Sequence, residues 1–179
     1  MGSSPSCSRA LSSPAVKPSL EEFRTLAERG NVVPVYAQLA ADFETPLSAY
    51  LKIRDGRHAF LFESAESTDA SGRWSIVGSC PTRVFEAHGG EVVIRKGGEE
   101  TTIAAERDPL AELEKFMSSF NPVCHGDAPP FFGGAVGYLA YDGVRQFEPS
   151  VGEPPPDDLK LPEAVFMITD SVLLFDHKL

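Results

Sequence analysis

The sequence predicts an α+β domain in which helices flank an antiparallel β-sheet or sandwich. Two observations indicate this class. Helical and extended patterns do not alternate along the chain, as they do in parallel α/β folds. In addition, three short extended segments separated by Gly89-Gly90 and Gly97-Gly98 have the pattern of a meander. With 179 residues, the chain is long enough for one domain with a buried core and no disulfide bonds.

The first residues of the chain are rich in serine and proline, and no acidic residue precedes Glu21. Such a segment buries too little apolar surface to order itself. We therefore expect a disordered tail over residues 1–18 and a folded domain over residues 19–179. Two alternatives remain for the segment 1–20: a transit-like segment, and a myristoylation signal that begins at Gly2.

Three helices are expected from their start signals. Ser19 and Glu22 form a capping box before an apolar-periodic segment that ends at Gly30. Thr45 followed by proline starts a second helix, which ends at Asp55-Gly56. Asp108 followed by proline caps a third, whose apolar stripe is typical of a core-facing helix.

The expected strands cover residues 58–64, 74–78, 83–87, 91–95 and 101–103, a segment within 131–142 that leads into a turn or short helix, and residues 164–176. The last of these reads as one long buried strand close to the C-terminus. No covering segment follows it, so we expect an exposed sheet edge near Val165–Phe175 and a tendency to associate. The architecture looks as if it continues beyond this point.

Composition excludes several classes of function. Sixteen basic against twenty-six acidic residues give a net charge of −10, which argues against nucleic acids and anionic membranes as partners. No apolar run of about 18 residues predicts a transmembrane helix. Cys7, Cys80 and Cys124 show neither paired nor metal-like spacing and are interpreted as free thiols in a reducing compartment. We expect a cytoplasmic protein, or a plastid protein if residues 1–20 are a transit remnant.

The common catalytic signatures are missing. The four histidines lack zinc spacing, so no metal site is expected in this chain. The glycine-rich segment Gly133–Gly137 lacks the Lys-Ser/Thr of a phosphate-binding loop and is interpreted as a site of close backbone packing. We expect no catalytic residue.

One polar group of residues stands out. Glu63-Ser64 ends an apolar strand, and Arg73 begins the next one after a polar loop. Together they supply an acceptor for an ammonium group and a donor for a carboxylate, as a free amino acid requires. Phe62 and Trp74 are candidates to line an apolar slot beside them. The alternative is an ion pair between Glu63 and Arg73 that closes the loop.

Six motifs in order resemble the N-terminal region of anthranilate synthase component I, a family closely related to aminodeoxychorismate synthase component I. They are the segments 31–36, 45–52, 61–64, 72–78, 133–138 and 161–167. The resemblance covers residues 19–179 and implies that this domain is part of a larger, two-region chorismate-enzyme fold.

The resemblance implies a lyase that converts chorismate and ammonia to anthranilate and pyruvate in tryptophan biosynthesis. A glutamine amidotransferase subunit delivers the ammonia, and chorismate and Mg²⁺ bind to the C-terminal region, which this chain lacks. The chain alone is therefore expected to be inactive and to carry feedback inhibition by L-tryptophan. The implied allosteric tryptophan-binding residues are Leu61, Glu63, Ser64 and Arg73.

The chain departs from the family pattern in three places. Phe62 replaces a leucine, and Trp74 replaces a tyrosine. A second tryptophan-contacting segment of the type Asn-Pro-Ser-Pro-Tyr-Met does not occur, so half of the pocket is missing and the isolated chain should bind weakly. Two alternatives remain open: the same region of aminodeoxychorismate synthase, in the folate pathway, and a free-standing amino-acid-binding module.

Overall fold

The computed structural model describes residues 14–63, 72–104, 108–126, 128–146, 148–152 and 156–178. Its helices are α1 (Leu20–Ala27), α2 (Pro46–Ile53) and α3 (Pro109–Met117), with the 3-10 helices η1 (Tyr141–Gln146) and η2 (Pro149–Val151). Its strands are β1 (Val16–Lys17), β2 (Tyr36–Ala37), β3 (Ala59–Glu63), β4 (Trp74–Ser79), β5 (Arg83–His88), β6 (Glu91–Lys96), β7 (Glu99–Ala104), β8 (Gly134–Leu139), β9 (Ala164–Thr169) and β10 (Val172–Asp176).

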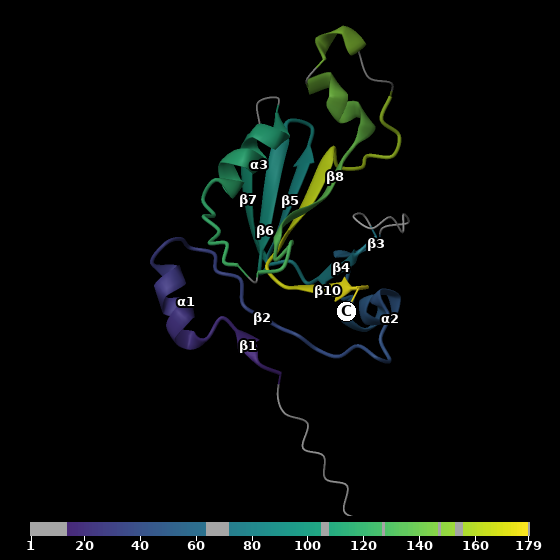
Figure 1. Ribbon diagram of the computed structural model, residues 1–179. Coiled ribbons are helices and arrows are strands. Elements are labelled where there is room, and N and C mark those ends of the chain that lie inside the picture. The colour runs from purple at the N-terminus through teal and green to yellow at the C-terminus, as the bar shows by residue number, and fades with distance from the viewer. Residues whose placement is uncertain are drawn as a thin grey trace, which may run out of the picture.

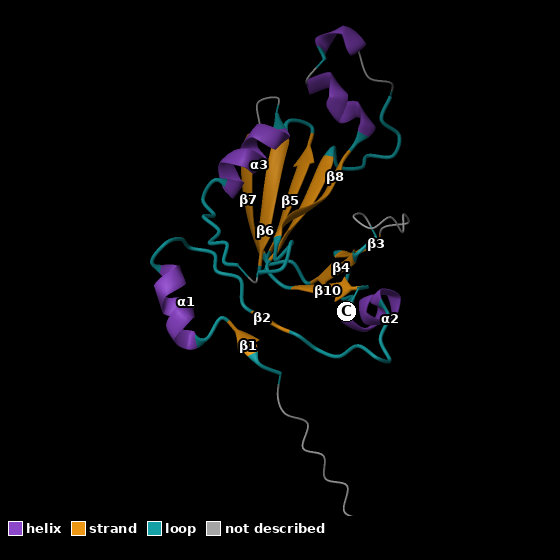
Figure 2. Ribbon diagram, viewed as in Figure 1, coloured by secondary structure: helices purple, strands orange, loops and turns teal. Residues whose placement is uncertain are grey.

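Within the described residues, the strands form antiparallel sheets (Figures 1 and 2). The larger sheet has the order β7-β6-β5-β9-β8, and the smaller has the order β10-β4-β3. A two-stranded pair, β1-β2, lies near the N-terminal end of the described chain. The α+β class predicted from the sequence is confirmed.

The expectation of one long strand over residues 164–176 is wrong. The chain leaves the larger sheet after Thr169 and enters the smaller one at Val172. The segment between β4 and β5 runs beside this connection in the opposite direction, from the smaller sheet to the larger one. This follows because β4 pairs with β10 and β5 pairs with β9. The register shifts by one residue between the two sheets, and Cys80 at this passage has a φ of 51°. An extra residue in such a conformation bends a strand pair sharply.

The prediction of an exposed sheet edge near Val165–Phe175 is wrong for β9, because β9 lies between β5 and β8. It is confirmed for β10, which is an edge strand. In the described chain, the other edge strands of these two sheets are β7, β8 and β3.

Two apolar clusters lie on opposite faces of the larger sheet. Phe85 and Ala164 pack on the face that Leu113 of α3 covers. Val136 and Met167 pack on the other face against Phe60 of the smaller sheet. Because antiparallel partners share a face, the register of β5, β8 and β9 explains this separation. The layers are therefore α3, the larger sheet, and the smaller sheet with α2 beside it (Figure 1).

The helix caps predicted from the sequence are confirmed. Ser19 and Thr45 each form a capping box, and the Asp108 side chain accepts hydrogen bonds from backbone N–H groups of the first turn of α3. The structure places β1 before Ser19, and the division into a tail over residues 1–18 and a domain over residues 19–179 stays a prediction.

The glycine-rich segment approaches its neighbouring strand as closely as expected. A Cβ atom at Gly137 would lie 1.8 Å from the Val165 carbonyl oxygen, and one at Gly133 would lie 2.6 Å from the Thr169 carbonyl oxygen. β8 therefore packs against β9 at a distance that only glycine permits at these positions.

Candidate functional site

Glu63, Arg73 and Asp176 lie at one end of the smaller sheet. Glu63 is the last residue of β3 and pairs with Ser75, while Trp74 begins β4 and pairs with Asp176, the last residue of β10. The register therefore brings together residues from the middle and the end of the sequence. Glu63 and Arg73 lie at the same end of the sheet, as the sequence predicted, but the Arg73 guanidinium contacts Asp176 and Trp74, which lie on the face opposite to Glu63.

The Arg73 guanidinium forms a two-point ion pair with the Asp176 carboxylate. Nε donates to Oδ1 at 2.9 Å, and Nη2 donates to Oδ2 at 2.6 Å. The Arg73 Cζ atom also lies 4.7 Å from the centre of the Trp74 ring, within cation–π range. The hydrogen bond from Arg73 holds the pKa of Asp176 below its ordinary value, and the same hydrogen bond raises the pKa of Arg73.

The ion-pair partner of Arg73 is Asp176. The partner considered from the sequence was Glu63. Among the described residues, the ion pair of Arg73 is with Asp176, and the Glu63 side chain is exposed and takes part in no ion pair. The alternative of a Glu63–Arg73 ion pair is therefore wrong for the described residues. Ser64, the other residue of the expected acid–hydroxyl pair, lies outside the described residues.

Phe62 and Glu63 point to opposite faces of the smaller sheet, because consecutive residues of a strand alternate. Phe62 shares its face with Phe60 and Trp74, and its side chain is 51% exposed. Phe62 and Trp74, the candidates to line an apolar slot, therefore share one face of the sheet, and Glu63 lies on the other.

Leu61 lies on the other face, with Glu63. Its cross-strand partner Val77 is fully buried, and Leu61 itself is half-buried. α2 packs on β3 and β4 and buries Ala49, and the Asp55 N–H donates to the hydroxyl of Ser79, which points the same way as Val77. α2 therefore covers the face that carries Leu61 and Glu63.

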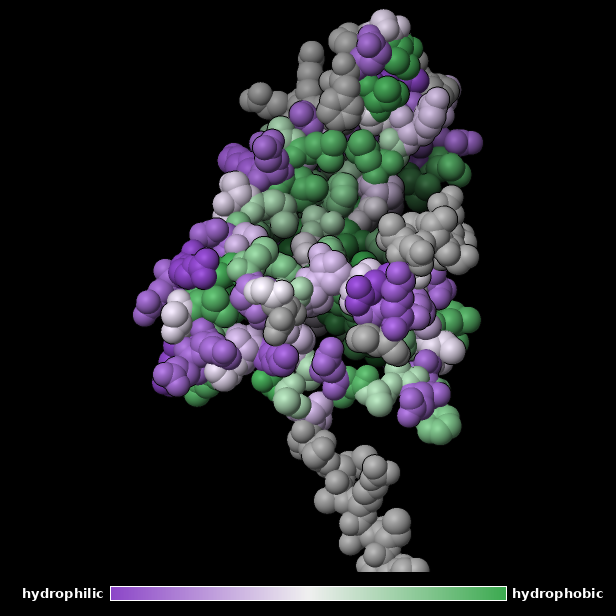
Figure 3. Space-filling view, in the orientation of Figure 1, coloured by the Kyte–Doolittle hydropathy of each residue, from purple (hydrophilic) through white to green (hydrophobic). Residues whose placement is uncertain are grey.

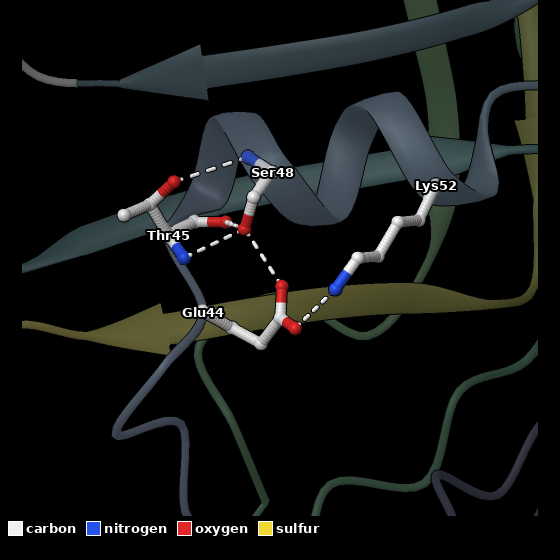
Figure 4. A network of polar contacts seen from close by, with 4 residues as sticks. All are labelled: Glu44, Thr45, Ser48 and Lys52. Atoms are coloured by element: carbon white, nitrogen blue, oxygen red, sulfur yellow. Dashed lines mark hydrogen bonds and ion pairs between the residues drawn. The ribbon is translucent and has the colours of Figure 1, made fainter.

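Polar contacts at its first turn hold α2 in place (Figure 4). The Ser48 hydroxyl donates to the Glu44 carboxylate at 2.7 Å, and Lys52 forms an ion pair with the same carboxylate. The hydrogen bonds from Lys52 and Ser48 hold the pKa of Glu44 below its ordinary value. These contacts stabilise the helix that backs Leu61.

Sequence reasoning missed Ser75, Asp176 and His177. The Ser75 hydroxyl is 2.7 Å from His177 Nε2, and the His177 N–H donates to the Arg73 carbonyl oxygen at 2.9 Å. Asp176 and Arg73 are 103 residues apart in sequence. No local motif links two segments at that distance, so only the strand register could have revealed the contact.

A large cavity lies elsewhere in the described chain. Its volume is about 1420 Å³, and it lies between the segment 30–37 and the passage from β9 to β10. Leu61, Glu63 and Arg73 do not line it. In the space-filling view, apolar side chains gather over the larger sheet beside α3 (Figure 3).

Two further features are absent from the described residues. No three His, Cys, Asp or Glu side chains among them are grouped as a metal site. No helix in this part of the chain has both the length and the apolar character needed to cross a membrane.

Comparison with known proteins gives consistent relatives. No protein-family model matches the sequence. Anthranilate synthase component 1 of Acetivibrio thermocellus is 36% identical over 161 residues, and that of Pseudomonas putida is 39% identical over 159 residues. The Saccharomyces cerevisiae protein of the same name is 35% identical over 173 residues. These alignments cover 89%, 88% and 90% of this chain and 32% of each relative.

Among solved structures, the crystal structure of anthranilate synthase component I from Streptococcus pneumoniae TIGR4 aligns with a TM-score of 0.46 and 29% identity. This alignment covers 80% of the present chain and 30% of the other. The chain spans about a third of the length of the curated relatives that it matches. It is therefore a relative of anthranilate synthase component 1, and the match is consistent with the N-terminal region of that protein.

Proposed function

We propose that this chain is the N-terminal, tryptophan-sensing regulatory region of an anthranilate synthase large subunit. The observation that carries the proposal is the extent of the match: it takes in about nine tenths of this chain but about one third of each relative. A region of that size is one part of a larger enzyme.

In this proposal, the complete enzyme converts chorismate and ammonia to anthranilate and pyruvate, and a glutamine amidotransferase subunit supplies the ammonia. Chorismate and Mg²⁺ bind to the remaining two thirds of the large subunit. The residues described here do not fit a Mg²⁺ site, because no three metal-ligating side chains are grouped among them. The chain alone is accordingly proposed to be catalytically inactive.

Tryptophan is proposed to bind at the end of the smaller sheet. The exposed carboxylate of Glu63, with Ser64, accepts hydrogen bonds from the ammonium group, and Leu61 contributes apolar contact. Arg73 is the proposed donor to the tryptophan carboxylate, and its guanidinium contacts Asp176 and Trp74 at the same end of the sheet. The second wall of the pocket belongs to the rest of the large subunit.

Inhibition follows if tryptophan binds more tightly to a state in which the chorismate-binding region is less active. A coupling of about 1–3 kcal/mol between two such sites is typical, and it changes affinity by about 5- to 150-fold.

The experiment is a tryptophan titration of the complete enzyme whose large subunit contains this sequence. We expect inhibition of the wild type, and a rise of about tenfold or more in the half-inhibiting tryptophan concentration for Ser64→Ala and Glu63→Gln. kcat/KM for chorismate without tryptophan should not change. Ser118→Ala, at the exposed end of α3, is the control and should respond as the wild type does.

Unchanged inhibition in both site variants contradicts the proposed binding site. A wild-type enzyme that makes aminodeoxychorismate and ignores tryptophan supports the folate-pathway alternative. Micromolar tryptophan binding by the 179-residue chain alone, measured by calorimetry, supports a free-standing binding module.

A further inference from the structure

We propose that β10 pairs along its free edge with an extended, apolar segment from the rest of the large subunit, and that this segment fills the cavity beside β10. The inference rests on one part of the proposed function, namely that the chain is one region of a larger subunit. It is independent of tryptophan binding. In the described chain, β10 pairs with β4 on one side and with no strand on the other.

Alternate backbone groups of β10 face away from β4. The His177 N–H donates to the Arg73 carbonyl oxygen, which sets the phase of the hydrogen bonds between these two strands. In an antiparallel pair this direction alternates from residue to residue, so the N–H of Leu173 points to β4. The N–H groups of Val172 and Leu174 point the other way. These groups are available to a further strand.

β10 lacks the features that protect an edge strand from pairing with another segment. Its first four residues, Val172–Phe175, are all apolar, and it contains no lysine or proline. The edge strand β7 of the larger sheet is different, because it carries Glu99, Glu100 and two threonines. An apolar edge without such polar groups is a template for a further strand. The composition of β10 is therefore that of a strand inside a sheet.

The cavity of about 1420 Å³ has this edge in its wall, since Val172, Leu173 and Leu174 line it together with the segment 30–37. Its volume exceeds the roughly 300–1,000 Å³ of a typical small-molecule pocket, so a polypeptide segment fits it better than a small ligand does. No residue of β3, the other edge strand of the smaller sheet in the described chain, lines this cavity. The cavity therefore selects β10 as the edge that is continued.

The wall of the cavity suits an apolar segment that also offers a polar backbone group. Val33, Val35 and Phe132 contribute apolar side chains. Thr169 also lines the cavity and is 5% exposed, and its hydroxyl is buried with no hydrogen-bond partner among the described residues. Buried hydroxyl groups are nearly always hydrogen-bonded. A backbone group of the proposed segment would supply the missing partner.

The rest of the large subunit is the source of this segment. The chain spans about one third of each relative that it matches, so about two thirds of such a subunit lies outside the present structure. A segment of the same polypeptide is present at a high effective concentration, whereas a second copy of the chain must bind from solution. A second copy is the alternative occupant that the experiment must exclude.

The experiment is hydrogen exchange of the complete large subunit, resolved to single amides. If β10 is a free edge, the amides of Val172 and Leu174 exchange about 100-fold or more faster than that of Leu173, which bonds to β4. If a further strand is paired with β10, the alternation disappears and the three amides exchange at rates within about tenfold of one another. We expect the second result, at subunit concentrations where the protein is monomeric.

Leu174→Pro tests the same edge by mutation. Proline removes the outward-facing N–H of residue 174 and leaves the hydrogen bonds to β4 in place. Leu174→Ala is the matched control, because it also shortens the side chain but keeps the N–H. We expect Tm of the complete large subunit to fall about 3 °C or more further for Leu174→Pro than for Leu174→Ala. The exchange pattern of the wild type decides the question if Leu174→Pro does not fold.

Three outcomes overturn the inference. Fast exchange of Val172 and Leu174 beside slow exchange of Leu173 shows that β10 is a free edge in the complete subunit. Protection that disappears on dilution shows that a second copy of the chain is the occupant. Equal Tm values for Leu174→Pro and Leu174→Ala show that the outward N–H has no partner.

The proposed function is judged separately, by the tryptophan titration. A large subunit with uniform protection across β10 that ignores tryptophan contradicts the tryptophan-sensing role and supports the present inference. A large subunit that tryptophan inhibits but whose β10 amides alternate contradicts the present inference and leaves the tryptophan-sensing role in place.

Discussion

The ring of Phe60 lies over Gly78, its cross-strand partner, so closely that a Cβ atom at residue 78 would be 2.3 Å from Phe60 Cε1. The glycine is required here by packing, since a side chain would occupy the volume of the ring. Phe60 in turn packs against Val136 and Met167 of the larger sheet. Gly78 therefore allows one aromatic side chain of the smaller sheet to join the two sheets.

Gly78→Ala should destabilise the chain by about 1–3 kcal/mol, as overpacking of a filled core does. The loss arises because the Phe60 ring must leave its position and open a gap beside Met167. Urea denaturation should show a lower midpoint with an unchanged slope. Gly126→Ala is the matched control, because a Cβ atom there meets no heavy atom within 4 Å. Equal effects for the two variants would contradict this account.

Gly137→Ala should be more severe. The new Cβ atom would lie 1.8 Å from the Val165 carbonyl oxygen, which is backbone and cannot turn away as a side chain can. We expect the pairing of β8 with β9 to be lost, with a destabilisation above about 4 kcal/mol, or no folding at all. Hydrogen exchange of the β8 amides measures the lost pairing directly. Wild-type protection of these amides would show that β8 can shift away from β9 at little cost.

The two capping boxes should differ in what they stabilise. Thr45 caps α2, which buries Pro46 and Ala49, whereas α1, capped by Ser19, buries no residue. Loss of such a cap typically costs about 1 kcal/mol. Thr45→Ala should therefore lower the free energy of global unfolding, and Ser19→Ala should mainly speed hydrogen exchange within α1. A lower urea midpoint for Ser19→Ala than for Thr45→Ala would contradict this difference.

Local signals in the sequence were enough to predict the helix starts and the meander. Ser19, Thr45 and Asp108 cap their helices through atoms two or three residues away, and such contacts are visible in the sequence. The break after Thr169 was not visible in this way. It depends on the register shift near Cys80, in a strand pair whose partners are far apart in the sequence.

The candidate site was also predicted only as far as local sequence signals reach. The placement of Glu63 and Arg73 at one end of a sheet followed from a strand, a loop and a returning strand. The actual partner of Arg73 could not follow, because Asp176 arrives from a strand 103 residues away. The alternation of side chains along a strand predicts that Phe62 points away from Glu63. This alternation was hard to see in the sequence, because nearly all residues of the strand are apolar.

Asp176 also predicts how stability depends on pH. Its pKa in the folded chain is lowered by the hydrogen bond from Arg73, relative to an unfolded value of about 3.9. A carboxyl group with a lowered folded pKa stabilises the fold fully above its unfolded pKa. That contribution is lost as the pH falls through the folded pKa. The free energy of unfolding should therefore decrease below about pH 4. In Asp176→Asn this free energy should fall less steeply there and should be lower at pH 7.

Urea midpoints between pH 2.5 and 7 measure both slopes. Asp158→Asn, which changes an exposed aspartate before β9, is the control. Parallel acid limbs for the wild type and Asp176→Asn would show that the ion pair contributes nothing to the acid sensitivity of the fold.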